Sequence, residues 1–85
     1  MTDRRILLID DHPPIREGIA AVIQNATGFA VVGAAGTYRD GLREVRRQRP
    51  DIVILDLSLP DANGIDLIRS IVSELPAVLI MVLTM

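Results

Sequence analysis

The sequence predicts an α/β domain, built as a doubly wound parallel sheet with helices packed on its faces. Two observations lead to this prediction. Short apolar stretches without polar–apolar alternation, which are typical of strands buried on both faces, recur along the chain. Between them lie stretches whose apolar residues recur every three or four positions, as in amphipathic helices. The resulting order is βαβαβαβ, and the right-handed crossover rule then makes the strands parallel.

The first strand is predicted at residues 6–9, a continuous apolar run that ends at Asp10 and Asp11. Pro13 and Pro14 follow, and proline is well tolerated in the first turn of a helix. Apolar residues at helical spacing then predict a helix, and Gly28 marks its end.

The second strand is predicted at residues 29–35, which are short, apolar and rich in residues that favour strands. Thr37, with Asp40 three positions later, resembles a capping box in which aspartate replaces glutamate. This pattern predicts a second helix that runs to about residue 48. Pro50 ends it.

The third strand is predicted at residues 51–55, and a loop follows at residues 58–64. A third helix begins at Ile65, with apolar residues at helical spacing, and Pro76 ends it. Residues 77–83 form the last predicted strand. No repeat, low-complexity tract or linker interrupts this pattern, so the chain is interpreted as one domain.

The composition limits the classes of function. The chain of 85 residues has a net charge of -2, which gives no general reason to expect binding to nucleic acid or to an anionic membrane. The absence of cysteine excludes disulfides and thiolate sites and suits a reducing cytoplasm. The longest apolar run, residues 77–83, is far shorter than the roughly 20 residues of a membrane helix. We therefore expect a cytoplasmic protein without membrane association.

Carboxylates follow two of the predicted strands. Asp10 and Asp11 end the first strand, and Asp56 ends the third. Ligands of open parallel sheets bind outside the carboxyl ends of the strands, so these side chains are expected to converge if the two strands are neighbours. Converging carboxylates need a cation, and an oxygen-only ligand set suits Mg²⁺. An aspartate in such a site is also a possible nucleophile toward phosphorus, and the Thr84 hydroxyl could hydrogen-bond the transferred group.

An alternative interpretation applies to each acidic residue taken alone. A single aspartate at the end of a strand is usually a helix cap or a turn residue, and Asp11 and Asp61 fit that description well. His12, the only histidine, is expected to be a hydrogen-bonding loop residue, with a metal or proton role as the alternative. The arginine-rich second helix is expected to be a solvated face, because acidic residues are interleaved with the arginines.

Three segments, LLIDDHPPIREGI, DIVILDLSLPDANGIDLI and VLIMVLTM, resemble the response-regulator receiver domains of bacterial two-component systems. The resemblance is to the NarL-like branch, which precedes a helix-turn-helix DNA-binding domain. It implies a flavodoxin-like fold with strand order 2-1-3-4 and a phosphoryl group accepted on Asp56 from a sensor histidine kinase. The implied Mg²⁺ ligands are Asp10, Asp11, Asp56 and the backbone carbonyl of Ser58. Thr84 is implied as the switch hydroxyl, and Pro60 and Gly64 as residues that shape the loop.

The sequence also departs from the family. Receivers have five strands and five helices, with a lysine after the fifth strand, whereas all nine basic residues here are arginine. We therefore expect residues 1–85 to be an incomplete receiver, truncated after strand four, that would reach DNA only through a missing C-terminal domain. The strand at residues 77–83 would be an apolar edge, and self-association through it is expected.

Two other functions remain open at this stage. The chain could be a structural or dimerisation piece that keeps the fold but cannot be phosphorylated. An aspartate-based phosphohydrolase ranks third, because DLSLP lacks the second aspartate of the D-x-D-x-[TV] pattern. The favoured expectation is therefore a signalling module, not an enzyme.

Overall fold

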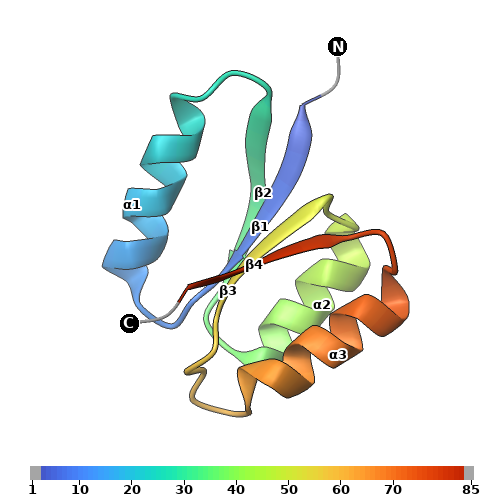
Figure 1. Ribbon diagram of the computed structural model, residues 1–85. Helices are drawn as coiled ribbons and strands as arrows, with labels where there is room; N and C mark the ends of the chain where they lie inside the picture. Colours follow the sequence, from blue (N-terminus) through green and yellow to red (C-terminus); the bar gives the residue numbers. More distant parts are fainter. Residues whose placement is uncertain (1–2, 84–85) are drawn as a thin grey trace.

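Four parallel strands form the centre of the molecule in the order β2-β1-β3-β4, as predicted. The computed structural model describes residues 3–83. Figure 1 shows α1 on one face of the sheet and α2 and α3 on the other. The elements are β1 (Arg4–Ile9), α1 (Pro13–Gln24), β2 (Phe29–Ala35), α2 (Tyr38–Gln48), β3 (Ile52–Asp56), α3 (Gly64–Glu74) and β4 (Leu79–Leu83).

Local sequence signals account for most of the element boundaries. Prolines occupy the first turn of α1, and the Thr37 side chain accepts a hydrogen bond of 3.1 Å from the Asp40 backbone N–H at the start of α2. The prediction for the last strand was wrong by two residues, since β4 begins at Leu79. The reason is a turn after α3, in which the Val78 N–H donates to the Leu75 carbonyl.

The two faces of the sheet are packed unequally. Alternate side chains of a strand point to opposite faces, so Leu7 and Ile9 join one core and Ile6 and Leu8 the other. The core under α2 and α3 holds eight buried residues: Leu7, Ile9, Val45, Val53, Leu55, Leu59, Leu67 and Ile71. Among residues 3–83, the core on the α1 side holds only Ile6, Leu8 and Ile54 as buried residues. No residue of α1 is itself fully buried.

Strand β4 forms one edge of the sheet, and its side chains are unusually exposed for an apolar strand. Leu79 is 60% exposed and Met81 57% exposed, both on a strand without a charged residue. Because the sheet ends at β4, one side of its backbone has no strand partner among residues 3–83. Within the same residues, no helix has the length and apolar character needed to cross a membrane.

Candidate functional site

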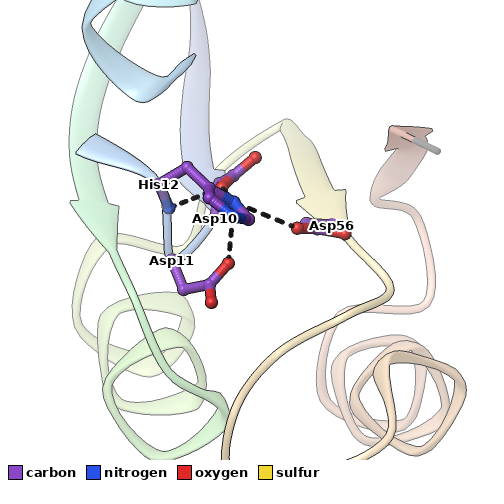
Figure 2. A group of neighbouring side chains, drawn as sticks. All are labelled: Asp10, Asp11, His12 and Asp56. Carbon is purple, nitrogen blue, oxygen red and sulfur yellow. Dashed lines mark hydrogen bonds and ion pairs between the residues drawn. The ribbon is translucent and has the colours of Figure 1, made fainter. Parts of the chain in front are cut away.

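The carboxylates predicted to converge do so at one end of the sheet. Strands β1 and β3 are neighbours in parallel register, with Ile9 opposite Leu55, so the residues that follow them emerge side by side. Figure 2 shows Asp10, Asp11 and Asp56 grouped at this crevice. Asp10 is 3% exposed and Asp56 is 4% exposed, which is exceptional for aspartate. Burial of like charges this close together calls for a cation.

The side chain of His12 lies in the middle of these carboxylates. Its Nδ1 is 2.9 Å from Asp10 Oδ1, 2.9 Å from Asp11 Oδ1 and 3.7 Å from Asp56 Oδ2. The sequence predicted a hydrogen-bonding loop residue, and the hydrogen bond to Asp10 is present. What the sequence did not indicate is that the ring would point into the crevice. Its position next to an acidic pair was the only available signal.

These acidic neighbours change the protonation of the imidazole. The hydrogen bond with Asp10 raises the pKa of His12 above its ordinary value of 6.5, and the nearby charge of Asp11 raises it further. The acidic neighbours therefore shift the protonation equilibrium of the ring toward its charged form.

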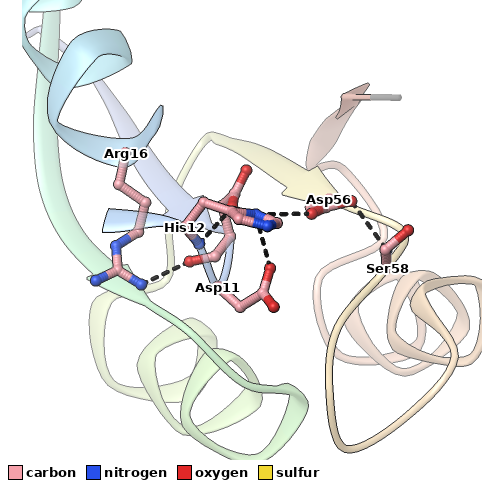
Figure 3. Close-up of polar contacts among 6 residues, drawn as sticks. Asp11, His12, Arg16, Asp56 and Ser58 are labelled. Atoms are coloured by element: carbon pink, nitrogen blue, oxygen red, sulfur yellow. Dashed lines mark hydrogen bonds and ion pairs between the residues drawn. The ribbon is translucent and has the colours of Figure 1, made fainter. Parts of the chain in front are cut away.

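Backbone contacts hold the turn after β1 in place. The Asp10 carboxylate accepts a hydrogen bond of 2.7 Å from the His12 backbone N–H, and the Asp10 carbonyl accepts one of 2.6 Å from Arg16 Nη1 (Figure 3). Gly36, just after β2, leaves room for this arginine, because a Cβ there would lie 2.9 Å from Arg16 Nη1. The turn therefore fixes the Asp10 side chain through Oδ1 and does not use the other carboxylate oxygen.

Asp56 is oriented by the loop that follows it. Its Oδ1 accepts a hydrogen bond of 2.9 Å from the Ser58 backbone N–H, while its Oδ2 faces His12 (Figure 3). Gly64 sits where a side chain cannot, because a Cβ there would be 2.5 Å from the Leu57 Cα. Its N–H donates to the Leu57 carbonyl, which closes the loop back on β3. Pro60 is exposed within this loop.

The same loop is tied to a second helix. Asp61 Oδ1 accepts a hydrogen bond of 2.6 Å from the Tyr38 backbone N–H, and Oδ2 accepts one of 3.1 Å from that of Arg39. These donors lie at the N-terminus of α2, so Asp61 acts as a helix cap from a distant loop. The hydrogen bond from Tyr38 is the main reason why the pKa of Asp61 is lowered from 3.8. The sequence predicted a helix cap or a turn residue at Asp61, and the cap is confirmed, although the helix that it caps precedes it in the chain.

The remaining site predictions are not decided by these contacts. Thr84 lies outside the described residues. Ser58 is exposed and lies two residues after Asp56. The role of its carbonyl in metal binding stays a prediction, as do the loop-shaping role of Pro60 and the phosphoacceptor role of Asp56.

The donor set of the crevice suits a divalent cation. One ligand atom from each of Asp10, Asp11, His12 and Asp56 lies within 4.8 Å of all the others. Asp11 Oδ1 is buried and has no hydrogen-bond partner. A buried carboxylate oxygen without a donor is strongly disfavoured unless an ion compensates it. The residues present therefore fit Mg²⁺, which commonly uses one or two carboxylates and several waters.

Comparison with known proteins gives a consistent picture. A model of the response regulator receiver domain matches residues 6–85. The DNA-binding transcriptional activator DevR/DosR of Mycobacterium tuberculosis is 36% identical over 94% of this chain and 37% of its own length. Some other relatives are named protein-glutamate methylesterases, and the chain matches at most 23% of their length.

Solved structures agree in fold. A two-component response regulator of the LuxR family from Aurantimonas is 40% identical, with a TM-score of 0.88 over 95% of this chain and 58% of that chain. RcsB of Salmonella enterica serovar Typhimurium, bound to a promoter in the presence of the phosphomimetic BeF₃⁻, is 29% identical, with a TM-score of 0.89 over 99% of this chain and 43% of that chain. The chain thus spans less than half the length of the transcriptional activator and of RcsB. The predicted receiver fold is confirmed.

Proposed function

The chain belongs to the response regulator receiver domain family, and on this premise we propose that Asp56 accepts a phosphoryl group from a sensor histidine kinase. One observation carries the proposal. Asp56 is a buried carboxylate at the end of a central strand, grouped with two further carboxylates that together suit Mg²⁺. The fold gives no structural reason to bury these charges, whereas phosphoryl transfer does.

The chemistry proposed for Asp56 is a nucleophilic displacement. A carboxylate oxygen of Asp56 forms a bond to phosphorus as the phosphorus–nitrogen bond of the kinase phosphohistidine breaks. The nitrogen leaves with the electron pair and takes a proton, and the product on this chain is an acyl phosphate.

The other residues of the crevice prepare this step. Asp10, Asp11 and Asp56, with the Ser58 carbonyl as a further proposed ligand, would hold Mg²⁺. When bound, the ion offsets the negative charge of the transferred phosphoryl oxygens. Thr84 is the proposed hydroxyl that would contact the phosphoryl group. The role is that of a phosphoacceptor and not of an enzyme.

The proposed output is regulation of transcription through a DNA-binding domain elsewhere in a longer protein. The support is the name of one relative, a DNA-binding transcriptional activator, and the promoter-bound state of another. Such an output acts where the chromosome lies, so the cytoplasm is the proposed location.

The test of Asp56 is labelling by a small phosphodonor, followed by peptide mass spectrometry. We expect slow labelling on Asp56, since no lysine is available to stabilise the phosphoryl group. Asp56→Asn should abolish the label. Asp66→Asn, which changes an exposed aspartate of α3, is the matched control and should leave it unchanged. Label that persists in Asp56→Asn would refute the proposal, and a complete absence of label would favour a structural piece unable to accept phosphate.

Self-association through β4 is a separate proposal. The edge is apolar and uncharged, and an edge strand can pair with its own copy about a two-fold axis. A net charge of -2 opposes such pairing only weakly. Sedimentation should show concentration-dependent dimers that Met81→Lys reduces. Val22→Lys, on an exposed apolar site of α1, should have no effect, and a monomer at all concentrations would rule the pairing out.

A further inference from the structure

The exposed side of α2 is strongly basic. Four of the nine arginines of the chain lie on this helix of 11 residues, together with two acidic residues, although the whole chain has a net charge of -2. The rest of the chain is therefore negative. At physiological ionic strength, salt screens exposed charges beyond about 8 Å, so a ligand in contact with α2 responds mainly to its local positive charge.

The acidic residues of α2 do not share a row with the exposed arginines. Residues four positions apart form rows along a helix, with Cβ atoms about 5–6 Å apart. Asp40 and Glu44 belong to a row next to β2, since Glu44 Oε2 lies 3.8 Å from the place that a Cβ on Gly33 would take. A different row, exposed to solvent, holds Arg39, Arg43 and Arg47. The arginines therefore present one continuous line of positive charge.

The arginine row has donors available for a ligand. Arg43 Nη2 donates to Asp40 Oδ1 at 2.7 Å. Arg47 Nη1 lies 3.8 Å from Glu44 Oε1, which is too far for a hydrogen bond. Among residues 3–83, only the backbone N–H of Arg39 is in a hydrogen bond. Each guanidinium has five N–H donors, and exposed ion pairs of this kind contribute little, so an incoming carboxylate can replace them.

A partly apolar row lies beside the arginine row. Tyr38 and Leu42 pack against the core with part of their surface. The Tyr38 hydroxyl is held 2.7 Å from Ser70 Oγ of α3, the helix next to α2 in Figure 1. Both rows line a shallow hollow of about 630 Å³, whose lining residues all belong to α2: Tyr38, Arg39, Leu42, Arg43, Arg46 and Arg47. The surface therefore offers cations next to a small apolar area.

We propose that this surface of α2 docks an acidic, amphipathic helix of a protein partner. Carboxylates four residues apart on that helix would pair with the arginine row, and an apolar side chain would contact Leu42. A guanidinium suits this role, because its planar fork binds a carboxylate through two parallel hydrogen bonds. A nucleic acid fits less well, since a long polyanion would extend over the negative rest of the chain and its phosphates have no counterpart for the apolar row.

Binding of a labelled helical peptide to the 85-residue chain tests the proposal. The peptide carries glutamate at every fourth position and a row of leucines beside the glutamates. Fluorescence anisotropy at low salt should show saturable binding that is lost when glutamine replaces glutamate and weakened about threefold when serine replaces leucine. Arg43→Gln should weaken binding by about threefold, and the triple change of the arginine row by more than about tenfold.

Arg69→Gln, which changes an exposed arginine of α3, is the matched control and should leave the affinity for the peptide unchanged. Equal weakening by Arg43→Gln and Arg69→Gln would overturn the inference, because net charge alone would then explain the binding. Glutamine and glutamate peptides of equal affinity would also overturn it.

NMR of the unchanged protein locates the bound peptide. We expect saturable shifts of the backbone amides of α2 and none on α1. Shifts elsewhere without shifts on α2, or no saturable binding at low salt, would refute the docking surface. A DNA duplex that displaces the peptide at equal or lower concentration would refute the protein partner and indicate a general surface for polyanions. None of these outcomes depends on Mg²⁺ or on phosphorylation of Asp56.

Discussion

Two aspartates mark the two ends of β3, and their surroundings are opposite. Asp51, just before the strand, is exposed and accepts a hydrogen bond of 2.8 Å from the Arg5 backbone N–H. Asp56, at the other end, is 4% exposed and shares its crevice with Asp10 and Asp11. The contacts of Asp51 account for its presence as a structural residue. Those of Asp56 do not, because the same fold would be easier to form with a neutral residue there.

The surroundings of Asp56 depend on the loop after β3. Of the changes considered, Gly64→Ala should disrupt that loop and lower the stability of the protein most. A Cβ at this position would lie 2.5 Å from the Leu57 backbone, which cannot move aside as a flexible side chain can. We expect the free energy of unfolding to fall by about 2 kcal/mol in urea denaturation. Gly18→Ala is the control with the opposite sign, since nothing lies within 4 Å of it. In a helix interior this change should stabilise by up to about 1 kcal/mol. A stable Gly64→Ala protein would mean that the loop has room to rearrange.

Neutralising each of the two aspartates should change stability in opposite directions. Without a metal ion, Asp56→Asn relieves repulsion between buried carboxylates and should raise the free energy of unfolding by about 1 kcal/mol. Asp51→Ala removes the acceptor of the Arg5 N–H and should lower it by about 1 kcal/mol. Denaturation with and without Mg²⁺ checks both. Saturating Mg²⁺ should reduce or reverse the advantage of Asp56→Asn, because the ion binds only the folded wild-type crevice tightly. If Asp56→Asn destabilised the protein in the absence of metal, the claim that the buried Asp56 carboxylate opposes folding would be wrong.

A smaller effect is expected at Asp61, which resembles Asp51 in being a structural carboxylate. Its folded-state pKa is lowered by the hydrogen bonds from α2, so its contribution to stability is present above the ordinary pKa of 3.8. That contribution is lost as the pH falls through the lowered value. Asp61→Asn keeps a hydrogen-bond acceptor but removes the charge. The difference in stability between this variant and the wild type should therefore shrink as the solution becomes acidic. Acid titrations of the two proteins by circular dichroism would show this convergence, and parallel curves would argue against the cap.

Short-range patterns explain why so much of the fold could be predicted. The Thr37 cap and the prolines of α1 affect only residues within a few positions of them in the sequence. Each was found in its expected place. The grouping of Asp10 with Asp56 followed from parallel strand order, which apolar patterning also indicates.

Side-chain directions in loops could not be predicted in the same way. The His12 ring could have faced solvent, and only the turn after β1 aims it at the crevice. Asp61 caps a helix that lies 23 residues earlier in the chain, which no local signal reveals. Both depend on tertiary packing that brings separate segments together.

The most direct test of the central claim is a Mg²⁺ titration followed by NMR. We predict saturable shifts of the backbone amides at Asp10, Asp11 and Asp56, with Asp51 unaffected, and weaker binding in Asp11→Asn. Shifts of equal size at Asp51, or no saturable change at the crevice of the folded protein, would contradict the claim that only the carboxylates at the end of β3 and β1 form a site.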